Sequence, residues 1–309
     1  MTATTAAPGA SIGPRPLGAW TTVWTRGEGC EELARSLAHG DPVRIEGDLR
    51  AACIAARAEV LVTTKLTSFD LLRTVVPYHV DLAGAGAVVA AVGSGPHSVL
   101  AARVAARLAE HLGVEGSLIS VSPTAEHDAG AHRALERISA EVPGIPYTLV
   151  REPNARALVN DLPPDALLVI GAPGGSWLQR QFFGPGHQLV VAARTGAVVV
   201  RDAPLRCFHR ADAPAALGAG LLVADALLLA VHPVTAVVDD GALVGIVRSS
   251  ALASAAPGDT VESIMEDAVF LSIDDPIEAA GDLADFLDGA PIPVVDGGGR
   301  LVGSLTPPG

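Results

Sequence analysis

The chain has 309 residues, which is enough for two or three domains with hydrophobic cores of their own. Its formal net charge of −13 would repel the phosphate backbone of DNA or RNA, so we do not expect nucleic-acid binding. The longest apolar stretch, residues 221–238, contains Asp225, His232 and Pro233, which argues against a membrane span. No charged, apolar leader opens the chain, and we therefore expect a cytoplasmic protein.

Residues 1–16 are rich in Ala, Thr, Gly and Pro, and they are predicted to form a disordered tail. Short apolar strands and short helical segments then alternate over residues 17–82. The predicted strands are 20–24, 42–46 and 58–63, and the predicted helices are 29–38, 49–57 and 69–75. This order predicts a small α/β region.

Strands and helices alternate again over residues 85–204. The predicted strands are 87–92, 117–121, 147–150, 166–170 and 197–201, and the predicted helices are 98–112, 126–141, 155–160 and 188–194. In the first of these helices Leu100, Val104, Leu108 and Leu112 recur every four residues and form one apolar stripe. Parallel strands joined by right-handed crossovers account for this alternation, so we predict an α/β fold with a doubly wound, five-stranded parallel sheet.

A glycine-rich loop follows the fourth of these strands. The stretch from Gly171 to Gly174 comes directly after the apolar run 166–170, and Gly184 follows after nine further residues. Because glycine leaves the backbone N–H groups unobstructed, such a loop between a strand and a helix can bind phosphate. The spacing differs from the dinucleotide-binding fingerprint and from the P-loop. The plainer alternative is that these glycines only permit a tight turn.

The loop and the order of elements over residues 85–204 resemble a universal stress protein domain, which has an adenine nucleotide alpha hydrolase-like fold. The nucleotide loop of that family reads Gly, two residues, Gly, nine residues, Gly, and then Ser or Thr. The resemblance implies that ATP or another adenine nucleotide binds at Gly171, Gly174 and Gly184.

Two polar groups of that family's nucleotide site are replaced in this chain. Gly93 stands where the family has an Asp at the end of the first strand, and Pro185 stands where it has the Ser or Thr of the loop. Gly93 keeps the place of the Asp in the implied cleft, and His97 and His187 lie nearest to that cleft in the sequence pattern. We therefore include Gly93 and His187 among the candidate cofactor-binding residues.

Residues 207–309 contain an internal repeat. Residues 233–247 and 290–303 both read as strand, turn and strand with an Asp-Gly turn signal, and the two copies lie about 57 residues apart. Residues 261–270 read as the linker and strand that open the second copy, and its helix starts near 275–280. This region resembles a CBS-domain pair, also called a Bateman module, which implies an α+β fold.

The ribose-binding motif of the CBS family is incomplete in both copies. Its usual form is Gly, two apolar residues, Thr or Ser, two residues and an Asp that binds ribose hydroxyls. Arg248 and Ala251 take the places of the hydroxyl and the Asp in the first copy, and Thr306 and Gly309 take them in the second. Only Thr306 keeps the chemistry of the motif, so it is a candidate cofactor-binding residue. The competing interpretation is a folded CBS pair without a nucleotide.

The remaining reactive side chains form no familiar site. Cys30, Cys53 and Cys207 are scattered, which argues against a disulfide framework. Cys207 and His209 offer two metal ligands where a structural zinc site needs four, so we predict no metal site. No nucleophile–base motif is present, and we assign no catalytic residue and do not expect an enzyme.

Three hypotheses about function remain open. The first is a cytoplasmic, stress-related regulatory or sensor protein that binds an adenine nucleotide in residues 85–204 and uses the CBS pair for dimerisation or regulation. The second is a dimeric scaffold that binds no nucleotide and contacts an unknown partner protein. The third is an enzyme with its activity in the N-terminal region. Both families that the chain resembles usually pair, so we expect a homodimer, with neither nucleic acid nor a membrane as a partner.

Overall fold

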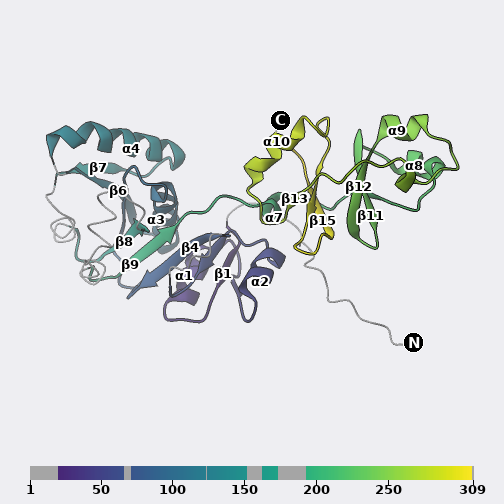
Figure 1. Cartoon of the computed structure of the whole chain (residues 1–309). Coiled ribbons are helices and arrows are strands. Elements are labelled where there is room, and N and C mark those ends of the chain that lie inside the picture. The colour runs from purple at the N-terminus through teal and green to yellow at the C-terminus, as the bar shows by residue number, and fades with distance from the viewer. Residues whose placement is uncertain (1–19, 66–70, 123, 152–161, 173–192, 308–309) are drawn as a thin grey trace. The chain divides into compact units, whose positions relative to one another are not determined.

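The structure of the protein is a computed structural model, and it describes residues 20–65, 71–122, 124–151, 162–172 and 193–307. The chain divides into two compact units (Figure 1). The sheet unit takes its described residues from 20–49 and 58–203. The C-terminal unit begins at Pro204 and also includes the segment Arg50–Arg57 from the N-terminal region.

The described N-terminal region gives the sheet unit β1 Thr22–Trp24, α1 Cys30–Leu37, β2 Val43–Arg44, β3 Val60–Val62 and β4 Arg73–Tyr78. These strands have the order β2-β1-β3-β4, and neighbouring strands are parallel. The prediction of a helix over 69–75 is wrong for its final residues, because β4 begins at Arg73. The β-branched run from Thr74 to Val76 favours a strand, and Pro77 disfavours a helical conformation in the residue before it.

The second set of strands comes from residues 87–201. Its elements are β5 Ala87–Ala91, α3 Ser98–Leu112, β6 Glu115–Val121, the short 3-10 helix η1 Ala125–His127, α4 Asp128–Glu141, β7 Tyr147–Val150, β8 Ala166–Gly171 and β9 Ala197–Arg201. These strands have the order β9-β8-β5-β6-β7, and neighbours are again parallel. The predicted helix 155–160 and most of the predicted helix 188–194 lie outside the described residues.

The two sets form one mostly parallel sheet, which has nine strands instead of the predicted five. They are joined by β4 and β9, which pair in the antiparallel direction with Val76 opposite Val199. The order β2-β1-β3-β4 in the first set matches β6-β5-β8-β9 in the second, and β7 extends the second set. An approximate twofold axis through the β4–β9 pair therefore relates the two sets, and the first set is a shorter version of the second.

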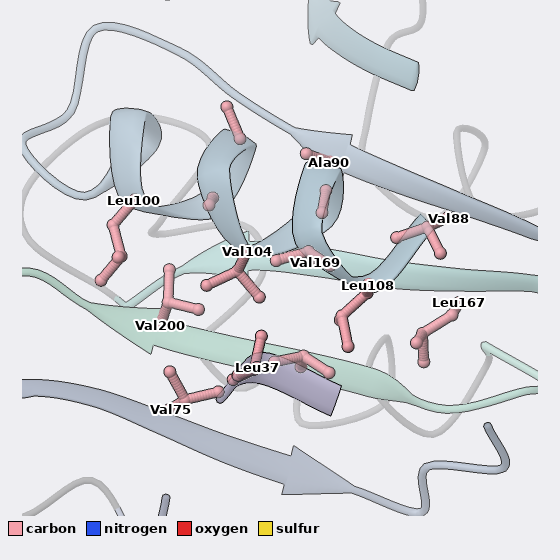
Figure 2. Close-up of a cluster of buried hydrophobic side chains, with 14 of the residues drawn as sticks. Leu37, Val75, Val88, Ala90, Leu100, Val104, Leu108, Leu167, Val169 and Val200 are labelled. Carbon is pink, nitrogen blue, oxygen red and sulfur yellow. The ribbon is translucent and has the colours of Figure 1, made fainter. Parts of the chain in front are cut away.

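Both faces of the sheet are buried along its central strands, whereas the edge strands β2 and β7 are largely exposed. Side chains from α1, α3 and strands of both sets pack together on one face, and they include Leu37, Val75, Leu100, Val104, Leu108, Val169 and Val200 (Figure 2). A second cluster on the opposite face includes Val76, Val89, Leu168, Ile170 and Val199. Strands that are buried on both faces read as continuous apolar runs, which is why 166–170 was recognisable in the sequence. The predicted stripe on α3 is confirmed, since Leu100, Val104 and Leu108 are buried and the partly buried Leu112 packs against the same cluster.

The C-terminal unit contains two copies of one motif, introduced by α7 Cys207–Arg210 and separated by η2 Val261–Ser263. The first copy consists of β10 Ala216–Gly218, α8 Val223–Leu229, β11 Val234–Asp239, β12 Ala242–Arg248 and α9 Ser249–Ser254. The second consists of β13 Leu271–Ser272, η3 Ile277–Ala279, α10 Ala280–Ala284, β14 Ile292–Val295 and β15 Leu301–Leu305. In each copy the first two strands are parallel and the last two are antiparallel.

The repeat extends to the details of the two hairpins. The register shifts between Val237 and Val238 in the first hairpin and at the equivalent place, between Val294 and Val295, in the second. The turns also bond reciprocally: the N–H of Leu243 donates to the carbonyl of Gly299, and that of Leu301 donates to Gly241, each at 3.0 Å. An approximate twofold axis therefore relates the two copies as well.

α2, Leu49–Ala55, lies in the C-terminal unit although β2 precedes it and β3 follows it in the chain. The buried Arg57 donates from Nη2 to the carbonyl oxygen of Ala211 at 2.6 Å, and Arg50 forms an ion pair with Asp274. The C-terminal unit is thus not one continuous stretch of sequence. Within the described ranges, no helix has the length and apolar character needed to cross a membrane.

Candidate functional site

The carboxyl ends of β5 and β8 form a topological switch point in the sheet. β5 lies between β6 and β8 and is parallel to both, so the chain leaves β5 toward one side of the sheet and later returns to the other. Open α/β sheets bind ligands at such points, outside the carboxyl ends of the strands. Ala91 pairs with Ile170, so Gly93 and Gly171 both lie at this edge. Gly171 is the last residue of β8.

Only the beginning of the glycine loop belongs to the described part of the chain. Gly171 and Ala172 are described, whereas Gly174, Gly184 and His187 lie outside the described residues, as does Pro185. The N–H of Ala172 donates to the carbonyl of Val200, so the chain still follows β9 at this point.

Gly171 lies in close contact with the start of α3. A Cβ atom at Gly171 would stand 3.0 Å from the Cβ of His97, which is tighter than an ordinary contact, and at an ordinary 3.6 Å from its backbone carbonyl carbon. A larger residue would have to push β8 away from the helix. The glycine therefore permits the end of β8 to approach the helix N-terminus closely, as a phosphate-binding turn requires.

Gly93 has open space around it. No heavy atom of the described residues lies within 4 Å of the position that a Cβ would occupy there, apart from chain neighbours. The backbone N–H of Gly93 donates to the side-chain oxygen of the buried Ser98 at 3.0 Å. This N–H is thus already bonded within the protein, and no other group of the described residues occupies the position of a side chain at residue 93.

His97, the residue before α3, is held by the end of β9. The backbone N–H of Asp202 donates to Nδ1 of His97 at 3.0 Å. Because Nδ1 accepts this bond, the neutral ring carries its proton on Nε2. Burial lowers the pKa of His97, Arg201 lowers it further, and the carboxylate of Asp202 opposes both. The imidazole is therefore neutral at pH 7.

The side chain of Asp202 is fixed in turn by β4. Oδ1 of Asp202 accepts hydrogen bonds from Nε of Arg73 and from the backbone N–H of Ala203, each at 3.0 Å. The Arg73 side chain is only 15% exposed. Sequence reasoning missed Arg73 and Asp202, since Arg73 fell within the predicted helix 69–75 and Asp202 simply follows a strand. Their only sequence signal is that each is a charged residue at one end of an apolar run: Arg73 precedes the run of β4, and Asp202 comes just after the run of β9.

The cysteine and histidine of α7 have a structural arrangement. Nδ1 of His209 accepts a hydrogen bond from the backbone N–H of Arg206 at 2.8 Å, and its ring stacks on Phe208. Burial raises the pKa of Cys207 to about 12, and the nearby carboxylates of Asp275 and Asp274 add to the shift. Such a thiol is neither a nucleophile nor a ready metal ligand. The described residues contain no group of three or more side chains that could hold a metal ion.

A small cavity lies between the two copies of the motif in the C-terminal unit. Its volume is about 60 Å³, and Val234, Pro293 and Ser304 contribute to its lining. Pockets that bind drug-sized ligands usually have volumes of about 300–1,000 Å³. The cavity is therefore too small for a nucleotide in this arrangement of the two copies.

Arg248 occupies the place of the motif's hydroxyl in the first copy, and it joins the two copies. Its Nε donates to Oε1 of Glu266 at 3.0 Å and its Nη1 donates to Oδ2 of Asp288 at 2.7 Å. Nη2 donates to the carbonyl of Phe286 at 3.2 Å, and the guanidinium lies over the Phe286 ring. Thr306, in the second copy, is exposed and directly follows β15.

No family model matches the chain, and neither does any curated protein. The solved structures that resemble it are CBS-domain pairs, which match about a third of the chain. The cytosolic domain of the Mg2+ channel MgtE in complex with ATP is 28% identical, with 33% of this chain and 45% of that chain covered and a TM-score of 0.30. The CBS domains of a transcriptional regulator from Streptococcus pneumoniae are 21% identical, with 33% and 92% covered and a TM-score of 0.30. The CBS-pair protein CBSX2 from Arabidopsis thaliana is 26% identical, with 30% of this chain and 83% of that chain covered and a TM-score of 0.28.

Proposed function

We propose that this protein is a cytoplasmic, stress-related regulatory protein that binds an adenine nucleotide at the carboxyl edge of the sheet unit. The observation that carries the proposal is the placement of Gly171, which ends β8 at the switch point and lies against the first turn of α3. Backbone N–H groups at such a turn can bind phosphate, and the helix N-terminus adds partial positive charge. The spacing of Gly171, Gly174 and Gly184 supports the same site.

The state of the cysteines supports the cytoplasmic part of this proposal. Cys30, Cys53 and Cys207 are all buried, and none of the three is in a disulfide. Proteins of oxidising compartments usually pair their cysteines, whereas free thiols are typical of a reducing compartment.

The C-terminal unit serves for self-association and regulation in this proposal, with a homodimer as the functional form. Its α8 and the residues after it expose the large apolar side chains Leu227, Leu228, Leu229 and Val231. Leu228 is 83% exposed. Clusters of this kind are typical of surfaces that contact another protein. Sedimentation velocity at micromolar concentration tests the dimer, and a monomer would contradict this part of the proposal.

The second candidate function is a dimeric scaffold that binds no nucleotide. The arrangement of Arg248 favours the scaffold. This arginine stands where the motif has a ligand-binding hydroxyl, and its guanidinium is already bonded to Glu266 and Asp288. The same contacts join the two copies without help from a ligand. In this function the protein would present its surfaces to an unknown regulatory partner protein.

Thermal-shift measurements on the full-length protein separate the two functions. We expect ATP, ADP or AMP to raise the melting temperature, with cyclic nucleotides and S-adenosylmethionine as the comparison set. A ligand at one hundred times its dissociation constant stabilises the native state by about 2.7 kcal/mol. If none of these compounds shifts the transition at millimolar concentration, the nucleotide-binding proposal is wrong and the scaffold is favoured.

A further inference from the structure

More than half of the large apolar side chains that are exposed in the described residues lie on one short segment. There are nine such side chains, and five of them are on α8 or beside it: Leu222, Leu227, Leu228, Leu229 and Val231. These five side chains form the α8 patch. Figure 1 shows α8 next to α9, on the side of the first hairpin that faces away from the second copy. Exposed apolar patches mark contacts with another molecule.

Among its described residues, the sheet unit has no comparable patch. Its exposed large apolar side chains are Val43 and Tyr147, which lie singly on the edge strands β2 and β7. Single exposed apolar residues are normal on a protein surface. The pairing of β4 with β9, which joins the two sets of strands about their approximate twofold axis, is already made within one chain. The α8 patch is therefore the described surface best suited to self-association.

The second copy of the motif does not repeat this patch. Ala226 and Ala280 hold the same place in the two copies, because both are fully buried and the residue before each donates its N–H to the carbonyl three residues earlier. Two residues further on, the first copy has Leu228, which is 83% exposed, whereas the second copy has the exposed Asp282. The most exposed apolar side chain of the first copy thus corresponds to a carboxylate in the second.

This difference between the copies decides which surfaces can meet in a dimer. The helical face of the second copy exposes Glu278, Asp282 and Asp285. Two second copies in contact would bring like charges together, which opposes association. A second copy against the α8 patch would bury carboxylates among leucines, which is costly without a paired cation. Two α8 patches in contact bury apolar surface on both sides, and a twofold interface uses the same patch of each protomer.

We propose that two copies of this chain associate head to head, with the α8 patch of one protomer against the α8 patch of its partner. This inference rests on the homodimer of the proposed function and adds which surfaces meet and in which orientation. It does not depend on the nucleotide site. In the head-to-tail alternative, the α8 patch would meet the second copy of the motif in the partner, and Leu228 would face carboxylates instead of leucines.

Sedimentation velocity of the full-length protein over a range of concentrations tests the orientation, with Leu228 replaced by a charge of either sign. In a head-to-head dimer like charges meet, so Leu228→Arg and Leu228→Asp should each raise the dimer dissociation constant at least about tenfold. An equimolar mixture of the two variants pairs opposite charges and should dimerise within about threefold of wild type. Val43→Arg, the same kind of change at the exposed edge strand β2, is the matched control and should stay within about twofold.

A head-to-tail dimer gives a different pattern, because an arginine at position 228 would then meet the carboxylates of the second copy and tighten the dimer. Tighter association of Leu228→Arg, or wild-type association of both Leu228 variants, overturns the inference while the homodimer stands. A monomeric wild type contradicts the homodimer and the inference together. Leu228 is too exposed to support the fold, so the circular dichroism spectra of its variants should match the wild type. ATP titration judges the nucleotide site separately.

Discussion

The carboxyl edge of the sheet and the two hairpin copies of the C-terminal unit have each lost side chains of the motif they resemble, but with different consequences. At Gly93 the place of the missing carboxylate is open among the described residues. In the first hairpin copy, Arg248 fills the place of the hydroxyl and binds Glu266 and Asp288. The open position at Gly93 leaves room for a ligand, whereas a ligand at Arg248 must first displace two charged hydrogen bonds.

The largest expected effect is a difference in stability when one methyl group is added to a glycine in each region. A Cβ at Gly245 would stand 2.6 Å from the carbonyl oxygen of Glu266 and 2.8 Å from Sδ of Met265. Gly245→Ala must therefore disturb the bridge between Ile246 and Glu266, and we expect a loss of about 1–3 kcal/mol in the free energy of unfolding. Gly93→Ala is the matched control, since its methyl group enters open space, and it should change stability by less than about 0.5 kcal/mol. Urea unfolding followed by circular dichroism compares them, and equal losses would contradict the difference between the regions.

The features that sequence predicted well are those that repeat locally. The apolar runs of β5, β8 and β9 identified buried parallel strands, the four-residue spacing of Leu100, Val104 and Leu108 identified α3, and two similar stretches revealed the C-terminal repeat. Each depends on neighbours in the chain. Gly171 could be placed at a strand end for the same reason.

The features that sequence did not predict depend on contacts between distant segments. β4 joins the sheet because it pairs with β9. Its sequence contains only a short β-branched run, and the predicted helix 69–75 included the first residues of that run. Arg73 and Asp202 meet although 129 residues separate them. The position of α2 in the C-terminal unit likewise follows from contacts of Arg50 and Arg57 with residues far along the chain. Local patterns carry no information on such pairings.

The next effect is a gain of binding when a carboxylate is restored. Gly93→Asp places the acid where the resemblance expects it and where space is open, so ATP should bind about tenfold more tightly, or about 1.4 kcal/mol. Ala251→Asp is the matched variant in the first hairpin copy. There Arg248 still fills the neighbouring place, so we expect no gain. Calorimetric titration measures both, and tighter binding in Ala251→Asp alone would reverse the comparison.

The smallest effect is a dependence of stability on pH through His97. Burial lowers the pKa of this residue in the folded protein, so above about pH 6.5 the ring is neutral in both the folded and unfolded states. As the pH falls below that value the unfolded chain takes up the proton first, and stability falls until the pH passes the lowered pKa of the folded state. His97→Asn should reduce this fall. Melting temperatures between pH 8 and pH 5 measure it, and identical curves for the two proteins would show that His97 does not contribute.

The central claim is that the nucleotide binds in the sheet unit and not in the C-terminal unit. Deletion of residues 207–309 would test this poorly, because it would remove the contacts of Arg57 with Ala211 and of Arg50 with Asp274. Point variants in the full-length chain avoid that problem. Gly174→Val places a β-branched side chain in the glycine loop, and Thr306→Ala removes the remaining motif hydroxyl of the hairpin copies.

Calorimetric titration of ATP into the wild type and these two variants is therefore the most direct test. Gly174→Val should abolish binding, because a bulky β-branched side chain should obstruct the approach of phosphate to the backbone N–H groups of the loop. Thr306→Ala should leave the dissociation constant within about twofold, a change of about 0.4 kcal/mol. Binding that survives Gly174→Val and disappears in Thr306→Ala would place the nucleotide in the C-terminal unit and contradict the account.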